Sequence, residues 1–212
     1  MHGFRLGFIL LWSLATFPGF ASERTETHIF GDSIFSTSNH RIKGRLQELA
    51  QIPIYDHSVS GATMSQIQQQ YLQQRQASIQ TVILDGGGND ILGQRGICQH
   101  QLTPACKDSI HRVADIMEDT IQQMAYDGVS ELILLTCHYP VGWNAGFDQA
   151  VDYAFHLLQD ICEQSPIPCR LVDPRQTFKN RQDLFEWDGV HPNWNGSTLM
   201  AELIWESLVD AP

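Results

Sequence analysis

The chain has 212 residues, of which 13 are Lys or Arg and 24 are Asp or Glu, and its net charge at neutral pH is −11. This acidic balance argues against a polyanion such as nucleic acid as the main partner. Hydrophobic residues make up 42% of the chain, a share typical of globular domains, and no repeat or low-complexity tract interrupts it.

The first segment has the layout of a secretory signal peptide. Arg5 precedes an apolar run, and small residues follow at Gly19 and Ala21. We expect cleavage after Ala21, so that residues 1–21 form the leader and residues 22–212 form a single domain. A retained anchor helix is the alternative, although the apolar run is short for a membrane span. The leader predicts export, to a periplasmic or secreted location.

Strand-like and helix-like segments alternate along the rest of the chain. Short apolar, β-branched runs predict strands, and apolar residues at helical spacing predict helices. This alternation predicts a parallel sheet covered by helices on both faces, an α/β sandwich with right-handed crossovers. In chain order we expect strand 27–30, helix 39–51, strand 52–59, helix 63–76, strand 81–85, helix 108–128, strand 130–137, helix 147–162, strand 169–173 and, opened by Pro192, helix 193–208.

The five cysteines fall into two close pairs and one single residue. Cys98 and Cys106 flank one short Pro-containing loop, and Cys162 and Cys169 flank another. Both pairs are disulfide candidates, because export permits disulfides. Cys137 is left over, and we interpret it as a small buried side chain rather than a reactive thiol. We expect no zinc site, because the chain has no Cys-x-x-Cys pair.

Glycines and polar residues follow four of the five predicted strands. Ligands of open parallel sheets bind outside the carboxyl ends of the strands, so we expect these four patches to meet at one edge of the sheet. The patches are "GDS" with Asp32 and Ser33, "SVSGAT" with Gly61, "DGGGNDI" with Asn89 and Asp90, and "WDGVHPNWNG" with Asp188 and His191.

The residue types in these patches suit acyl transfer. Ser33 is locally no more than a helix-capping candidate, and it becomes a nucleophile only if a base stands beside it. His191 is the best base in the chain, because Asp188, three residues earlier, can reach the other ring nitrogen. Together the three residues would form a serine-type catalytic triad.

An oxyanion formed during acyl transfer requires hydrogen-bond donors. The backbone N–H groups of Ser33 and Gly61 and the side-chain amide of Asn89 are the candidates. Asp32 and Asp90 more plausibly hold the loops behind these groups as hydrogen-bond acceptors. His138, after the fourth strand, is a further candidate for substrate contact.

The four patches together resemble the sequence blocks of the SGNH (GDSL) hydrolase superfamily. "FGDS", a Gly after the second strand, "GGND" and "DGVHPN" match the family's blocks in order and spacing over the whole mature chain. Ile34 stands where many members have Leu, which leaves the chemistry unchanged. The resemblance implies a three-layer, flavodoxin-like α/β/α sandwich with strand order 2-1-3-4-5. It implies these roles: Ser33 nucleophile and oxyanion donor, His191 base, Asp188 its partner, Gly61 and Asn89 the rest of the oxyanion hole.

The resemblance also implies an activity, that of a serine esterase working through an acyl-enzyme without metal or organic cofactor. We expect a monomer that acts on a small-molecule, lipid or glycan ester. Candidate substrates are short acyl or aryl esters, lysophospholipids, thioesters and acetylated glycans. Trp143, Trp187 and Trp194, in loops near the expected site, would stack on a sugar or line an acyl pocket.

Two other functions compete with an esterase. A metal-dependent phosphoesterase would use Asp, Asn and His around paired ions, but the chain has no Asp-x-His pair. A glycan-binding member of the same fold with little turnover would not require the complete set of Ser33, His191 and Asp188.

Overall fold

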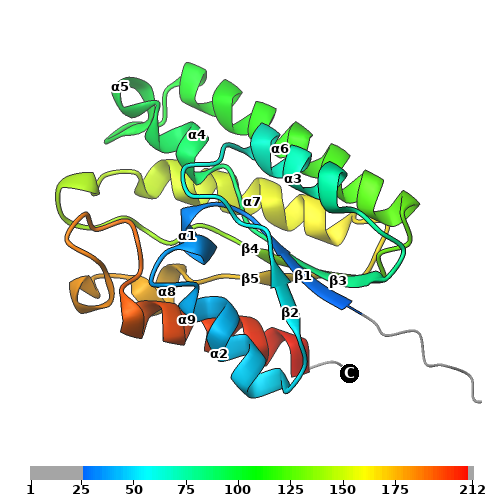
Figure 1. The fold of residues 1–212 in the computed structure, drawn as a ribbon. Coiled ribbons are helices and arrows are strands. Elements are labelled where there is room, and N and C mark those ends of the chain that lie inside the picture. The colour runs from blue at the N-terminus through cyan, green and yellow to red at the C-terminus, as the bar shows by residue number, and fades with distance from the viewer. Residues whose placement is uncertain (1–25, 210–212) are drawn as a thin grey trace, which may run out of the picture.

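The computed structural model describes residues 26–209, and the expected leader, residues 1–21, lies outside them (Figure 1). Five strands form one parallel sheet in the order β2-β1-β3-β4-β5, which confirms the predicted topology. The strands are β1 (Glu26–Phe30), β2 (Ile54–Asp56), β3 (Ile79–Leu84), β4 (Glu131–Leu135) and β5 (Cys169–Val172).

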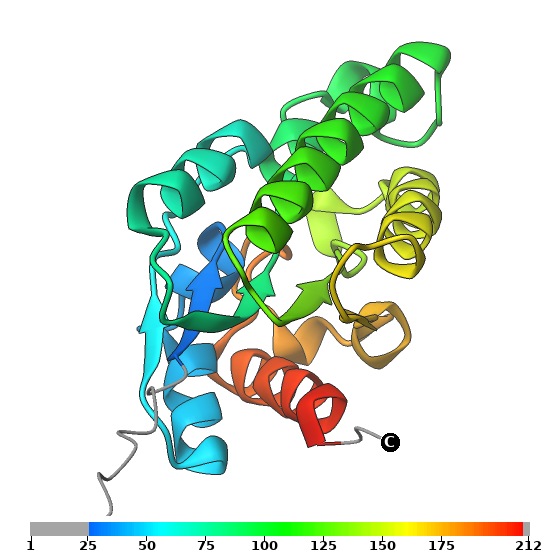
Figure 2. The ribbon, with the colours of Figure 1, turned by 90° about the vertical axis from the view of Figure 1, so that its right-hand side faces the viewer.

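Long helices cover both faces of this sheet, as the alternating pattern predicts. One face carries α3 (Met64–Gln74), α6 (Pro104–Tyr126) and α7 (Asp148–Glu163), and the opposite face carries α2 (Arg41–Ala50) and α9 (Trp194–Val209) (Figures 1 and 2). Because both faces are covered, the central strands are buried over most of their length, and they are continuously apolar from Val82 on in β3 and from Leu132 on in β4.

Short helices fill the connections that leave the carboxyl ends of the strands. They bring polar residues to this edge of the sheet, where the chain changes direction. They are α1 (Ser33–Ser36), α4 (Gly88–Leu92), α5 (Arg95–Cys98), α8 (Arg175–Phe178) and the 3₁₀ turns η1 (Gly142–Asn144) and η2 (Gln182–Leu184).

The expected start of one helix and the expected role of Pro192 are wrong. Helix α6 begins at Pro104 rather than at residue 108, because Thr103 caps it by accepting a 3.1 Å hydrogen bond from the N–H of Cys106. Helix α9 begins at Trp194, so Pro192 does not open it. Asn193 caps this helix instead, since its Oδ1 accepts hydrogen bonds from the second and third residues of α9.

Two disulfides tie neighbouring elements together. They join Cys98 to Cys106 and Cys162 to Cys169, with Cα atoms 5.1 and 5.3 Å apart, and Cys137 is a free cysteine. These are the two pairs that the sequence suggests. Over the described range of 26–209, no helix is both long enough and apolar enough to cross a membrane.

Candidate active site

Ser33 is the first residue of α1, directly after β1 reaches the carboxyl edge of the sheet. The helix cap is the preceding residue, Asp32, whose Oδ1 accepts a 2.9 Å hydrogen bond from the N–H of Ile34. The N–H of Asp32 in turn donates to Oδ1 of Asp85 at 2.9 Å. A Cβ on Gly31 would lie 1.9 Å from that same oxygen, so only glycine fits there. The Ser33 hydroxyl is therefore not engaged in capping.

Ser33, His191 and Asp188 form one hydrogen-bonded chain. The Ser33 Oγ lies 2.8 Å from Nε2 of His191, and Nδ1 of His191 lies 2.5 Å from Oδ2 of Asp188. The N–H groups of Val190 and His191 donate to Oδ1 of Asp188 at 2.9 and 3.0 Å. Burial acts to raise the pKa of Asp188, but these hydrogen bonds outweigh it and hold the pKa below its ordinary value. The carboxylate thus stays ionised beside the ring.

The connection between β4 and α7 holds the loop that carries Asp188 and His191. Nε2 of His138 donates to the carbonyl of Val190 at 2.7 Å, and Nδ2 of Asn144 donates to the carbonyl of Asp188 at 2.7 Å. The N–H of Val141 donates to the carbonyl between them, that of Gly189, at 2.8 Å. The sequence suggested His138 only as a substrate contact, and it contains no signal for Asn144, the last residue of the 3₁₀ turn η1.

His138 is buried among aromatic rings as well as hydrogen-bonded. Its ring centroid lies 5.5 Å from that of Phe178 and 5.0 Å from that of Phe185. Burial lowers its pKa to about 4, so the ring is neutral near pH 7.

Asn89 lies beside Asp32 at the start of α4. Its Nδ2 donates to Oδ2 of Asp32 and to the carbonyl of Ala62, both at 3.0 Å. An amide NH₂ has two hydrogens, so a substrate oxygen that used this donor would share or replace one of these acceptors. Asn89 lines the same cavity as Ser33 and His191. The structure therefore places Asn89 next to the candidate nucleophile.

Neither Gly61 nor Asp90 lines the cavity that contains Ser33. Gly61 follows β2 with a φ of +80°, and it does not line the cavity that contains Ser33. Asp90 accepts a 2.9 Å hydrogen bond from the N–H of Met64, the first residue of α3. Asp90 thus joins α4 to α3, and the role of Gly61 as an oxyanion donor stays a prediction.

Two buried carboxyl groups, Asp32 and Asp85, stand next to each other behind Ser33. Burial raises the pKa of Asp32 to about 6. Burial, together with the neighbouring Asp32, raises the pKa of Asp85 well above its ordinary value. Burial also raises the pKa of the Cys137 thiol to about 12. The thiol of Cys137 is therefore protonated at neutral pH.

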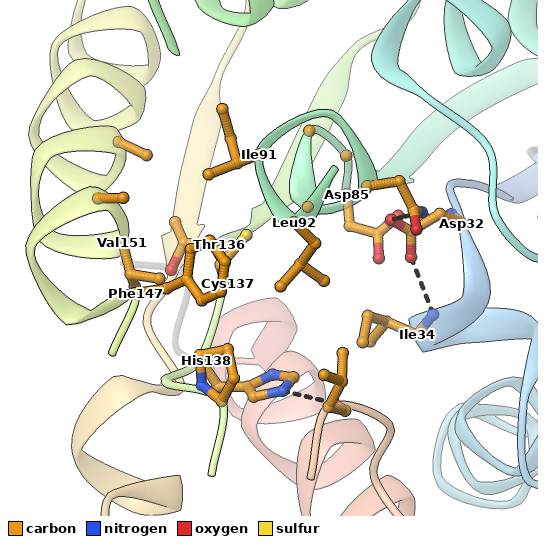
Figure 3. A pocket seen from close by; sticks show the side chains of 18 of the residues that line it. Asp32, Ile34, Asp85, Ile91, Leu92, Thr136, Cys137, His138, Phe147 and Val151 are labelled. Carbon is orange, nitrogen blue, oxygen red and sulfur yellow. Dashed lines mark hydrogen bonds between the residues drawn. The ribbon is translucent and has the colours of Figure 1, made fainter. Parts of the chain in front are cut away.

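A cavity of about 390 Å³ begins at Ser33 and His191 and extends between α6 and α7. Figure 3 shows Ile91 and Leu92 on one side of it and Phe147 and Val151 on the other. The exposed indoles of Trp143 and Trp187 also line it. Trp194 does not, because it belongs to α9, where the guanidinium of Arg41 lies 4.7 Å from its ring centre.

Within residues 26–209, no group of three or more His, Cys, Asp or Glu side chains is arranged to hold a metal ion. What the site does contain is a hydroxyl, an imidazole and a carboxylate in one line. Such a set can move a proton from the hydroxyl to the ring while the oxygen attacks a carbonyl.

Comparison with protein families gives one match over most of the chain. The model of GDSL-like lipases/acylhydrolases matches residues 28–204, which include all four polar patches. No curated protein sequence matches the chain.

Several solved structures share the fold at low sequence identity. A lipase from a goat rumen metagenome superposes with a TM-score of 0.69 at 16% identity, covering 86% of this chain and 97% of its own. A variant of an acetylxylan esterase from Geobacillus stearothermophilus gives a TM-score of 0.67 at 16% identity, with coverages of 88% and 95%. A lipase/acylhydrolase from Enterococcus faecalis gives 0.63 at 15% identity, with coverages of 86% and 94%.

Proposed function

The chain belongs to the GDSL-like lipase/acylhydrolase family, and from this premise we propose that it is an exported serine esterase in which Ser33 is acylated. One observation carries the proposal: the 2.8 Å contact between Oγ of Ser33 and Nε2 of His191, with Asp188 on the opposite ring nitrogen. The contact joins residues 158 positions apart in the sequence, so local turn formation does not account for it.

Acylation uses the three residues in turn. His191 accepts the proton of Ser33 at Nε2 while Oγ bonds to the ester carbonyl carbon. Asp188 accepts the hydrogen bond from Nδ1, fixes the tautomer and stabilises the imidazolium. The ring then gives its proton to the departing alcohol, which leaves the acyl group on Ser33.

Deacylation repeats the same proton movements with water. His191 takes a proton from the water that attacks the acyl carbon, and it returns this proton to Oγ as the acid leaves. Ser33 and His191 are thereby restored for the next ester. Over the whole cycle, one ester and one water are converted to an acid and an alcohol.

The oxyanion formed in both halves needs donors on the side of the carbonyl away from the histidine. We assign these to the N–H of Ser33, the N–H of Gly61 and the amide of Asn89. Support comes from the position of Asn89 on the wall of the Ser33 cavity, and from the hydrogen bond by which Asp32 orients its amide.

We also propose that the protein is exported and acts as a monomer. The leader over residues 1–21 directs the chain to a periplasmic or secreted location, where residues 22–212 act as one monomeric domain on a carboxylic ester. The two disulfides support export, because they persist in oxidising compartments. The solved structures with this fold include lipases and acetylxylan esterases, so lipid and acetylated glycan esters are the two substrate classes to separate.

The test is Ser33→Ala, assayed on p-nitrophenyl butyrate. Loss of the nucleophile should lower kcat/KM by roughly 10³–10⁶-fold, and the variant should no longer react with a fluorophosphonate probe. Ser36→Ala is the matched control, because its hydroxyl lies in the same short helix and has no hydrogen-bond partner among residues 26–209. A Ser33→Ala enzyme as active as the Ser36→Ala control would refute the proposal.

A further inference from the structure

The cavity that begins at Ser33 is much larger than the candidate reaction centre. It continues past the short helix α4 into the space between α6 and α7, and its volume is about 390 Å³. Cavities of 300–1,000 Å³ are the size that holds whole drug-sized ligands. An acetyl group, with three heavy atoms, would leave most of this space unused. The part beyond Ser33 therefore has room for a larger acyl group.

The far walls of the cavity are apolar. Helix α6 contributes side chains at i, i+3 and i+4 spacing, and α7 contributes side chains at i, i+1, i+4, i+7 and i+8, so each helix presents one continuous face. These side chains are Ile110, Val113 and Ala114 from α6, and Ala150, Val151, Ala154, Leu157 and Leu158 from α7.

Polar side chains line the cavity only near the reacting groups and its rim. Among them are Asp85, Thr136, Asn144 and Arg95, all from connections at the carboxyl edge of the sheet or from its strand ends. Between α6 and α7, a sugar ring would bury hydroxyl groups against hydrocarbon without side-chain hydrogen-bond partners, which is unfavourable. A hydrocarbon chain would bury only apolar surface there.

Small side chains keep the space between the two helices open. Ala114 on α6 and Ala150 and Ala154 on α7 each present a single methyl group to the cavity. A larger side chain at one of these positions would occupy volume that the wild-type protein leaves free. These alanines are therefore placed to set how long a chain the cavity accepts.

We propose that the space between α6 and α7 binds the linear aliphatic acyl chain of the ester, so that the protein prefers medium- to long-chain acyl esters over acetyl esters. This inference rests on the proposed function, because the ester carbonyl must lie at Ser33 for its chain to enter the cavity. Ala114, Ala150 and Ala154 are the specificity-determining residues.

The first experiment is a chain-length series on the wild-type protein. kcat/KM is measured for p-nitrophenyl esters from acetate to decanoate, below their solubility limits. Each methylene that leaves water for the cavity stabilises the bound ester and its transition state. kcat/KM should therefore rise by up to about fourfold per methylene until the cavity is full. Labelling rates of Ser33 by alkyl fluorophosphonates of the same chain lengths should rise in parallel. A series that is fastest at acetate in both assays overturns the proposal.

The second experiment fills the cavity. Ala154→Phe should lower the ratio of kcat/KM for octanoate to that for acetate by roughly tenfold or more, because the ring occupies the space of the distal chain. His156→Phe is the control, since it adds the same ring to the same helix at an exposed position that does not line the cavity. Ala114→Leu tests the opposite wall if Ala154→Phe does not fold.

The outcomes separate this inference from the proposed function. If Ser33→Ala hydrolyses every ester as fast as wild type, the proposed function fails. If hydrolysis needs Ser33 but the octanoate-to-acetate ratio is the same in wild type, Ala154→Phe and Ala114→Leu, only the acyl-chain inference fails. A lowered ratio in the cavity variants, with the ratio of His156→Phe equal to that of wild type, supports both.

Discussion

His138 supports the candidate site without belonging to its line of reacting groups. Its ring is packed against Phe178 and Phe185, and its hydrogen bond to the carbonyl of Val190 holds the loop between Asp188 and His191. A protonated ring is disfavoured in this buried environment. Protonation of His138 at low pH should therefore destabilise that loop.

The pH dependence of stability follows from the lowered pKa of His138. Its pKa is about 4 in the folded protein against an ordinary value of 6.5, so between these values the unfolded chain binds the extra proton. The stabilisation is present above pH 6.5 and is lost as the pH falls toward 4, by up to about 3 kcal/mol. Asp32 acts in the opposite direction, since its raised pKa of about 6 lets the folded protein take up a proton as the pH falls from 6.

The variant His138→Phe isolates the histidine contribution from that of Asp32. At pH 7.5 it should be less stable than wild type by about 1–3 kcal/mol, because the carbonyl of Val190 loses its donor. At pH 4.5 this deficit should shrink or reverse, because only the wild-type ring must stay unprotonated. Urea unfolding of both proteins at several pH values measures the difference. A deficit that does not change with pH would contradict the lowered pKa of His138.

At the scale of elements, the loop after η2 depends on a single glycine. Gly189, between Asp188 and Val190, has a φ of +69°, and a Cβ there would lie 2.2 Å from the carbonyl oxygen of Val141. Any other residue would be strained and would push the loop away from the β4–α7 connection. The distance between His191 and Ser33 depends on this contact.

We therefore expect Gly189→Ala to damage both stability and turnover. The substitution should cost more than about 1 kcal/mol in unfolding free energy, and kcat should fall by roughly 10²-fold if His191 moves by about 1 Å. The matched control is Gly44→Ala in α2, where a new Cβ meets no atom within 4 Å. That variant should be about 0.5–1 kcal/mol more stable than wild type, with unchanged kcat. Equal effects of the two substitutions would be evidence against this role of Gly189.

The sequence predicted the long elements because their apolar residues follow the faces that become buried. It did not predict α1 or α4, since helices of four or five residues are too short to show a period. The start of α6 could nevertheless have been predicted, because Thr103 followed by Pro104 is a typical helix start. The spacing of apolar residues alone predicted a start four residues too late.

Some residues of the candidate site could be predicted from the sequence and others could not. Ser33, His191 and Asp188 could be found because each follows a strand and because their order matches a known family. The roles of Asn144 and Asp85 could not be predicted, since an amide in a three-residue 3₁₀ turn and a carboxyl directly after a strand form no local pattern. Their positions depend on how distant segments pack.

At the scale of the whole molecule, the cavity is a feature of packing alone. From the sequence, the apolar faces of α6 and α7 are indistinguishable from ordinary core-facing stripes. In the fold, the carboxyl-edge parts of these two faces enclose free space that joins the candidate site. The same residues would be core in one arrangement and a binding surface in another.

The disulfides constrain the two helices that enclose this cavity. Cys98–Cys106 ties α5 to the first turn of α6, and Cys162–Cys169 ties the last turn of α7 to the start of β5. The two cysteines of each bond are eight and seven positions apart in the sequence, respectively. Closing a loop of this length corresponds to about 2–3 kcal/mol of stabilisation per bond. Disulfides persist in oxidising compartments, so these two bonds are consistent with the proposed export.

The proposed export can be tested by measuring the intact mass of the exported protein. When the full chain is produced in a host with an oxidising export compartment, the exported protein should begin at Ser22 and lack the four thiol hydrogens of the two disulfides. After unfolding without reductant, an alkylating reagent should modify one thiol, that of Cys137. A chain without residues 1–21 is the control, and it should stay inside the cell with all five thiols free to react. An exported protein that retains residues 1–21, or that has five reactive thiols, would show that the leader or the disulfide assignment is wrong.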